Sequence, residues 1–339
     1  MFYLRTLKNP AMYHGHQRQP DFFEGWYFKI IDATGDQRYA VIPGIFKHKN
    51  PAESHAFVQI LDGITGKSTY HRYDVSEFWA SKTDFEVRVG RNRFKRDAIS
   101  LDITSSDRQI MGTLRFENLT PWPHSLFAPG VMGPFAYLPF MECNHGVVSI
   151  DHAIRGELTV NDTTIDFSGG RGYIEKDWGA SFPSGYIWVQ TNHFEQPGTC
   201  LMVSIAMIPN FGFTFRGFLS GFWHSGTLYR FATYTGARID HLHLTDTNVQ
   251  WQLIGRTNGV KYRLEVNAER ASGGLLKAPY RVGMLERVVE SLTATAKVRL
   301  LKLNGQHETL IFQGTGRYAG LEVAGNLDPL LDEDLRKER

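Results

Sequence analysis

Two carboxylates stand two positions apart in a segment rich in aromatic and polar side chains. The segment comprises RGYIEKDWG at residues 171–179, SFP at 181–183 and YIWVQTN at 186–192. Its residues alternate with the period of a strand. An extended strand places Glu175 and Asp177 on one face, and Lys176 and Trp178 on the other. Two carboxylates on one dry face can hold a proton at neutral pH, as a general acid must.

Short strands must position these groups, because strand-length runs bounded by turn residues dominate the chain. Aromatic residues make up 13% of the sequence and glycine occurs 33 times, which favours β structure with tight turns. These runs predict an all-β protein built from antiparallel barrels or sandwiches. They cover residues 25–32, 38–46, 55–62, 85–89, 98–104, 111–116, 186–194, 199–208, 212–220, 227–235, 241–245, 249–257, 261–268, 293–303 and 307–314.

One segment in the C-terminal half has a helical pattern. In residues 284–292 the apolar positions fall at i, i+1, i+4, i+5 and i+8. This spacing is typical of an amphipathic stripe, so a short helix is predicted there.

The length of the chain, 339 residues, predicts two domains. A weak internal repeat supports this prediction. Trp26 opens a strand that is followed by a second strand at Ala40-Val41, and Trp188 is followed at equal spacing by Met202-Val203. We therefore expect two related β domains, at residues 1–165 and 166–339.

Composition and motifs argue against several classes of partner. The formal charge is only +2, so no nucleic-acid partner is expected. Dinucleotide and phosphate-loop fingerprints are missing from the sequence, so no cofactor is expected. The histidine pairs His14/His16 and His241/His243 lack a third ligand at diagnostic spacing, so no metal is expected. Two cysteines, no signal peptide and no long apolar run indicate a cytoplasmic protein.

A proline- and aromatic-rich loop at residues 121–140 separates the two halves. Four of its aromatic residues, Phe127, Phe135, Tyr137 and Phe140, fit a cover over an apolar pocket or a seal between domains. The loop is also our candidate for peripheral contact with a membrane that carries a hydrophobic substrate.

Several motifs resemble those of the tocopherol cyclase family, and they cover most of the chain. They are FEGWYFK at 23–29, MGPF at 132–135, LPFMEC at 138–143 with His145-Gly146, GY at 172–173 with EKDWG at 175–179, WVQTN at 188–192 and LLKAP at 275–279. The resemblance implies two lipocalin-like β-barrel domains. It also implies an enzyme that closes the chromanol ring of a prenylated hydroquinone or a related isoprenoid lipid. The plant members carry Asn where this chain has Asp177.

Such a ring closure needs a neutral acid in a dry place, because water would otherwise capture the cation formed by protonating the alkene. Glu175 and Asp177 suit this role, because burial and a second carboxylate both raise the pKa of a carboxyl group. Glu24 and Glu142 are the other acid candidates, and His145 is a candidate proton acceptor.

The remaining site residues are candidates for substrate binding. Trp26, Trp178, Tyr186 and Trp188 could offer aromatic faces to the cation, and Gln190 and Asn192 could orient the quinol oxygens.

Structural explanations compete with each of these roles. Trp26 could pack a barrel floor, and Glu24 could pair with Lys29 or Arg18. Glu175 and Lys176 could form an ion pair between domains, and Gln190 and Asn192 could satisfy a buried network. Two other functions also use an apolar barrel: a non-catalytic lipid carrier, and a hydratase in which water is the nucleophile.

Overall fold

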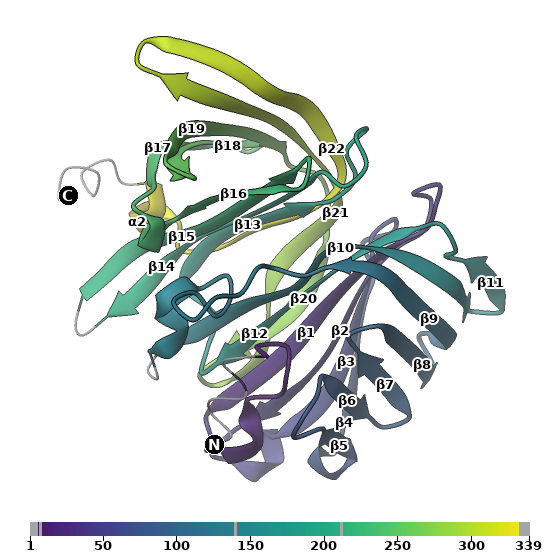
Figure 1. Cartoon of the computed structure of the whole chain (residues 1–339). Helices are drawn as coiled ribbons and strands as arrows, with labels where there is room; N and C mark the ends of the chain where they lie inside the picture. Colours follow the sequence, from purple (N-terminus) through teal and green to yellow (C-terminus); the bar gives the residue numbers. More distant parts are fainter. Residues whose placement is uncertain (1–5, 7–8, 139–140, 211–212, 332–339) are drawn as a thin grey trace. The chain divides into compact units, whose positions relative to one another are not determined.

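A computed structural model describes residue 6 and residues 9–138, 141–210 and 213–331. It divides into two compact units, and both are antiparallel β sheets, which confirms the all-β prediction (Figure 1). The first unit comprises Met1–Phe182 and Gly274–Glu286, and the second comprises Pro183–Gly273 and Arg287–Arg339. Within the described ranges, no helix is long and apolar enough to cross a membrane.

The first unit is built on a twelve-stranded sheet. Its order is β4-β3-β2-β1-β12-β10-β9-β8-β7-β6-β5, with β11 paired to β10. The sheet's first strand along the chain, β1, therefore lies beside its last, β12. The strands are β1 (Phe22–Ile31), β2 (Arg38–Lys47), β3 (His55–Asp62), β4 (Ser68–Tyr73), β5 (Phe78–Ala80), β6 (Glu86–Val89), β7 (Asn92–Lys95), β8 (Ala98–Thr104), β9 (Gln109–Thr120), β10 (Cys143–Val160), β11 (Thr163–Asp166) and β12 (Arg171–Gly179).

The second unit is built on a ten-stranded sheet that nearly closes into a barrel. Its order is β16-β15-β14-β13-β22-β21-β19-β18-β17, with β20 paired to β21. The strand β16 at one end also contacts β18 near the other end. The elements are β13 (Gly185–Thr191), β14 (Cys200–Asn210), β15 (Phe213–His224), β16 (Thr227–Ala232), β17 (Arg238–Leu244), β18 (Asn248–Thr257), β19 (Val260–Glu269), β20 (Gly274–Tyr280), β21 (Gly283–Asn304), β22 (His307–Gly325) and the short helix α2 (Asp328–Leu331). Of these, β20 lies in the first unit, beside β3 and β4.

Alternation along the strands separates a core face from a second face in each sheet. In β1, Trp26 and Phe28 belong to the hydrophobic core of the first unit. Tyr27 and Lys29 point to the other face, and both are nevertheless buried. The second unit repeats this arrangement in β13, where Ile187 and Val189 are core residues and Trp188 lies on the opposite face. Polar groups on these second faces are therefore held in dry surroundings.

The helix expected at residues 284–292 is wrong, because this segment is the first half of β21. Burial alternates with period two through Val288, Glu290 and Leu292 and onward to Leu300. The apolar spacing satisfied a helix over nine residues, but β-branched Val288 and Val289 and long pairing with β22 favour an extended chain.

Candidate functional site

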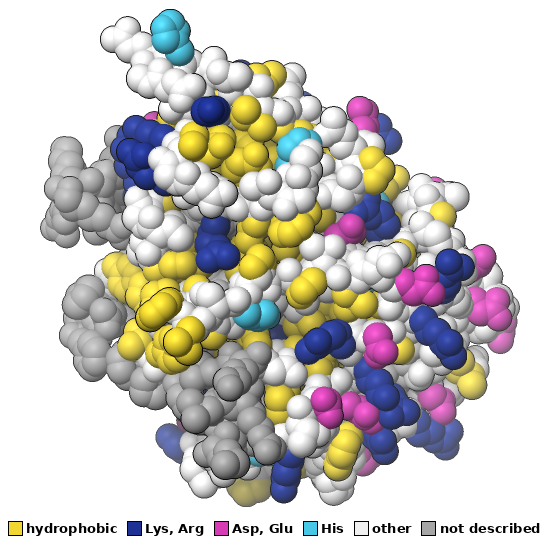
Figure 2. Space-filling model, in the orientation of Figure 1, with side chains coloured by type: hydrophobic (Ala, Val, Ile, Leu, Met, Phe, Trp, Pro, Cys, Tyr) yellow, Lys and Arg dark blue, Asp and Glu magenta, His cyan; other side chains and the backbone are white. Residues whose placement is uncertain are grey.

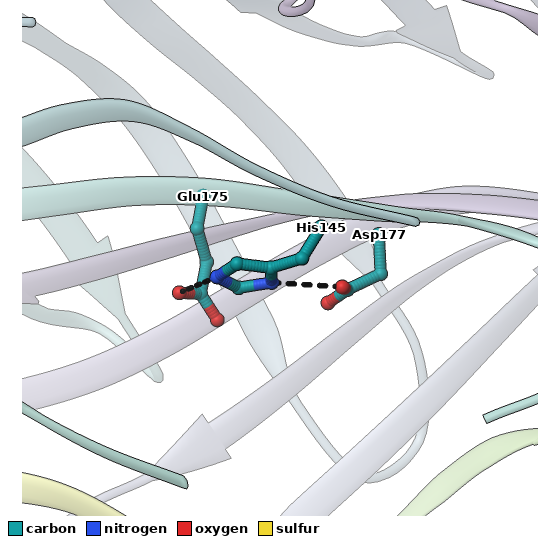
Figure 3. Close-up of side chains that lie close together, drawn as sticks. All are labelled: His145, Glu175 and Asp177. Carbon is teal, nitrogen blue, oxygen red and sulfur yellow. Dashed lines mark hydrogen bonds and ion pairs between the residues drawn. The ribbon is translucent and has the colours of Figure 1, made fainter. Parts of the chain in front are cut away.

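His145 lies between the two carboxylates that the sequence places on one face of a strand (Figure 3). His145 on β10 is the register partner of Asp177 on β12, and Val147 is the partner of Glu175. The Nδ1 atom of His145 lies 2.9 Å from Oδ1 of Asp177. Its Nε2 atom lies 3.4 Å from Oε2 of Glu175. Antiparallel pairing thus joins residues about 30 positions apart into one carboxylate–imidazole–carboxylate row.

Exposure falls along this row from one end to the other. The side chain of Asp177 is 23% exposed, that of His145 is 12% exposed and that of Glu175 is 7% exposed. At the dry end, the hydroxyl of Tyr173 donates a hydrogen bond to Oε2 of Glu175 at 2.5 Å. Tyr173 itself is fully buried. The row therefore runs from a partly solvated carboxylate to one that is enclosed.

This arrangement can store and move a proton. A protonated His145 would donate a hydrogen bond to each flanking carboxylate. If the imidazole is neutral instead, the proton it has lost resides on one of the two carboxyl groups. In either state the three groups share protons as one coupled system. The buried member of such a system can act as a general acid, and the solvated member can exchange protons with water.

The same three residues bring potential metal-ligating atoms within 4.8 Å of one another. However, the imidazole ring lies between the carboxylates, and each nitrogen faces a different one (Figure 3). A metal ion would need one nitrogen and both carboxylates to converge on a single point. The observed order of groups, with a hydrogen bond on one side of the ring and an ion-pair contact on the other, fits a proton relay better than a metal centre.

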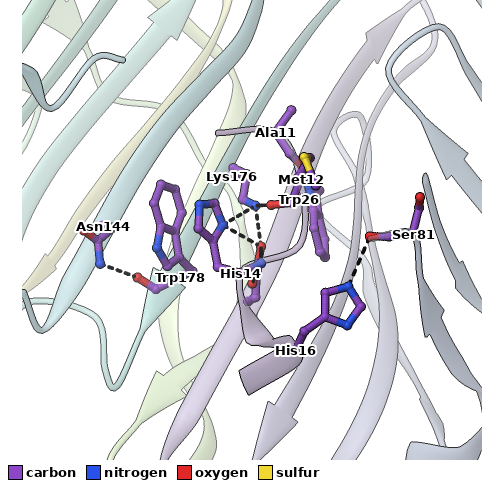
Figure 4. A network of polar contacts seen from close by, with 10 residues as sticks. Ala11, Met12, His14, His16, Trp26, Ser81, Asn144, Lys176 and Trp178 are labelled. Carbon is purple, nitrogen blue, oxygen red and sulfur yellow. Dashed lines mark hydrogen bonds and ion pairs between the residues drawn. The ribbon is translucent and has the colours of Figure 1, made fainter. Parts of the chain in front are cut away.

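The opposite face of β1 and β12 carries a second polar network, inside the core of the first unit (Figure 4). Glu24 and Lys176 form an ion pair there, and both side chains are fully buried. Lys176 also donates to the carbonyl oxygen of Met12 at 2.6 Å. The backbone N–H of His14 donates to Glu24 Oε2 at 2.9 Å. The network therefore fastens the segment before β1 to the middle of the sheet.

Aromatic rings enclose this network. The Nζ atom of Lys176 lies 4.6 Å from the ring centroid of Trp26 and 4.9 Å from that of Trp178. The imidazole of His14 stacks on Trp178 with centroids 4.1 Å apart. Trp26 and Trp178 both belong to the hydrophobic core. Two of the predicted cation-binding aromatic residues thus surround a cation that the protein itself supplies.

The pKa shifts in this network favour a charged pair and a neutral histidine. Burial opposes ionisation of Glu24, but Lys176 and His14 outweigh it, so the pKa of the Glu24 carboxyl is lowered. Burial lowers the pKa of Lys176 to about 8, because Glu24 offsets only part of the desolvation. Burial and the charge of Lys176 lower the pKa of His14 to about 4. Glu24 is therefore a carboxylate at neutral pH, whereas an acid catalyst must be protonated.

Glu142 has a different partner, and the remaining candidates belong to the second unit. Glu142 accepts a hydrogen bond from the largely exposed Arg281 at 2.7 Å. Tyr186, Trp188 and Gln190 share the second face of β13, as alternation predicts, and Asn192 is buried just after that strand.

Three further polar residues were missed by sequence reasoning. Tyr173 stands two positions before Glu175, so alternation could have placed it on the same face. In the second unit, Glu322 accepts a hydrogen bond from the Tyr186 hydroxyl at 2.6 Å and is the register partner of both Trp188 and the fully buried Glu290. Glu290 lay in the segment that was predicted as a helix. Pairing of Glu322 with β13 depends on distant strands, and no local pattern signals it.

Comparisons with known proteins agree with the sequence motifs. A family model described as tocopherol cyclase-like matches residues 104–325, which is more than half of the chain. The chain belongs to the tocopherol cyclase-like family. The tocopherol cyclase of the chloroplast of Zea mays is 26% identical over 95% of this chain and 78% of its own length. A probable chloroplast tocopherol cyclase of Oryza sativa subsp. japonica is 22% identical over 57% of this chain and 42% of its own length.

A solved structure shares the fold of this tocopherol cyclase-like chain. The structure of CghA with Sch210972 superposes with a TM-score of 0.55, and the match covers 91% of this chain and 89% of CghA. Sequence identity is only 12%, so this likeness concerns the fold alone.

Proposed function

We propose that this protein is an intramolecular cyclase that closes the ring of a prenylated hydroquinone, or of a related isoprenoid phenol, by acid catalysis. The observation that carries the proposal is the row formed by Asp177, His145 and Glu175, with Tyr173 at its dry end. Family membership supports the reaction class, because the Zea mays relative is a tocopherol cyclase.

In the proposed reaction Glu175, supplied by His145, donates a proton to the less substituted carbon of a trisubstituted alkene. A C–H bond forms and a tertiary cation develops at the other carbon. The phenol oxygen then attacks this cation, forms the C–O bond and releases its proton. The row takes this proton back, so the product has the mass of the substrate. The reaction is redox-neutral and balances without a further reactant.

Dry surroundings would protect the cation from water. Tyr27 on β1 is the register partner of Glu175, and Tyr27 and Tyr173 are both buried beside it. An aromatic face stabilises a nearby cation by roughly 0.5–2 kcal/mol. Roles for Tyr186, Trp188, Gln190 and Asn192 in binding the quinol remain predictions of this proposal.

We also infer that each unit is a lipocalin-like barrel. In each sheet the strand that comes first along the chain, β1 or β13, pairs with the strand that follows it and with the sheet's last strand along the chain, β12 or β22. This pairing of first and last elements supports the inference.

Incubation of the purified protein with a panel of prenylated hydroquinones under anaerobic conditions tests the function. Chromatography with mass detection should show a product of unchanged mass and shifted retention. Glu175→Gln should lower its formation by about 10²–10⁴-fold. Glu142→Gln is a matched control, because the carboxylate of Glu142 pairs with Arg281 rather than with His145. A product heavier by one water would indicate a hydratase, and a bound but unchanged lipid would indicate a carrier.

A further inference from the structure

The loop between β9 and β10 ends in an apolar tip that nothing in the proposed reaction uses. Leu126 is 77% exposed and Phe127 is 82% exposed. They occupy the two central positions of a turn, where small or polar residues are usual. Figure 2 shows apolar side chains over the part of the first unit where Figure 1 draws this loop. Together these two side chains expose roughly 300 Å².

The tip is preformed. The backbone N–H of Ser125 donates to the Ala128 carbonyl at 2.9 Å, and that of Ala128 donates to the Ser125 carbonyl at 3.2 Å. The Tyr137 hydroxyl donates to the carbonyl of Leu126. At the base of the loop, Trp122 and Val131 are buried and anchor it to the unit. Exposure of Leu126 and Phe127 is thus imposed by a fixed turn.

Charge is missing from the loop as far as its last residue, Glu142, which directly precedes β10. Residues 118–141 contain no Asp, Glu, Lys or Arg, although such residues make up 21% of the chain and about five would be expected in this stretch. Surface loops of soluble domains usually carry charge, and burying a charge in hydrocarbon is costly. An uncharged tip whose carbonyl is already hydrogen-bonded within the chain can enter a lipid phase at little polar cost.

The size of the tip distinguishes between occupants. A stable protein interface takes about 800 Å² from each partner, more than twice what this tip offers. Insertion into the interfacial region of a bilayer needs only a few apolar side chains, since affinity there grows with the apolar area buried. We propose that Leu126 and Phe127 insert into the surface of a lipid bilayer and dock the protein there. Because the tip carries no charge, docking should not require anionic lipid. This inference stands independently of the proposed reaction.

Co-sedimentation of the full chain with phosphatidylcholine vesicles tests the proposal. The double variant Leu126→Ser/Phe127→Ser should lower the partition coefficient at least tenfold, and 1 M salt should leave wild-type binding unchanged. The control is Ile64→Ser, which changes another exposed apolar residue in a turn of the same unit. Its binding should equal that of the wild type.

A second measurement reports insertion directly. Phe127→Trp should gain fluorescence that brominated phosphatidylcholine quenches, beyond the quenching of the wild type. Wild-type protein that stays in the supernatant would overturn the proposal, as would a double variant that binds as well as the wild type. If the wild type self-associates in lipid-free solution and the double variant does not, the proposal is also overturned. The tip would then bind a second copy of this chain and not a bilayer.

Discussion

His145 hydrogen-bonds its register partner Asp177 across two neighbouring strands, with 2.9 Å between Nδ1 and Oδ1. This bond leaves the opposite ring nitrogen facing Glu175. Asp177 therefore orients the imidazole, while Glu175 lies at the drier end of the row. The resemblance implies that plant members carry Asn at the position of Asp177, which would give this chain one more negative charge here than they have.

Asp177→Asn should lower turnover by roughly tenfold and narrow its pH range. The loss of the carboxylate destabilises the protonated row, so the alkaline limb of the activity profile should move to lower pH. The exposed turn residue Asp36 provides the control, as Asp36→Asn should leave both rate and profile unchanged. An unaltered profile in Asp177→Asn would show that Asp177 has no part in holding the proton.

Lys176→Met should destabilise the protein by about 3–5 kcal/mol, because it leaves the carboxylate of Glu24 buried without its cation. Unfolding in urea measures this loss. Adding Glu24→Gln should restore much of it, since the pair is coupled. Lys297→Met, which breaks an exposed pair with Glu269, should cost less than about 1 kcal/mol. A Lys176→Met variant as stable as the wild type would contradict the assignment of this pair as a structural fastening.

The free energy of unfolding should fall as the pH drops below about 6.5. Burial lowers the pKa of His14 to about 4 and that of His152 to about 3, so between these values and 6.5 the unfolded chain binds more protons than the folded one. In this pH range each histidine adds up to about 1.4 kcal/mol per pH unit to the slope of the free energy of unfolding against pH. Above pH 6.5 the histidine is neutral in both states, so the free energy of unfolding no longer depends on its titration.

Urea titrations at several pH values measure this slope. In His152→Asn the free energy of unfolding should change less steeply between pH 4 and 6, by the amount that one titrating proton contributes. This expectation holds whatever the substitution costs in stability at pH 7. Equal slopes in variant and wild type would mean that His152 does not remain neutral in the folded state.

Gly172→Ala should destabilise the first unit by about 1–3 kcal/mol. A Cβ atom at this position would lie 2.3 Å from Nε2 of the buried His152. Gly25→Ala, in the same sheet, would meet only ordinary contacts at 3.7 Å or more and should cost far less. Thermal unfolding compares the two variants. If Gly172→Ala unfolded at no lower a temperature than Gly25→Ala, His152 would have to move aside freely.

Local alternation predicted much of this architecture. The strands at residues 55–62 and 98–104 coincide with β3 and β8, and the same rule placed Glu175 and Asp177 together on the face opposite Lys176. No strand was predicted around His145, because the prolines and aromatic residues of the preceding loop hide the start of β10.

Pairings between distant strands escaped prediction. Glu24 was expected to pair with Lys29 or Arg18, yet its partner Lys176 is 152 positions away and is set by the register of β1 against β12. The predicted helix failed because a nine-residue window fits both periods, and only the pairing of β21 with β22 decides between them. Residues 139–140 of the predicted loop lie outside the described residues, so the role of Phe140 stays a prediction.

Turnover in deuterium oxide tests the central proposal most directly. If the row delivers the proton, wild-type protein given a prenylated hydroquinone in deuterium oxide should form a chromanol with one carbon-bound deuterium at the former alkene. Glu175→Gln should form almost none, and Glu142→Gln should match the wild type. A cyclic product without carbon-bound deuterium, or equal formation by Glu175→Gln, would contradict acid catalysis by this row.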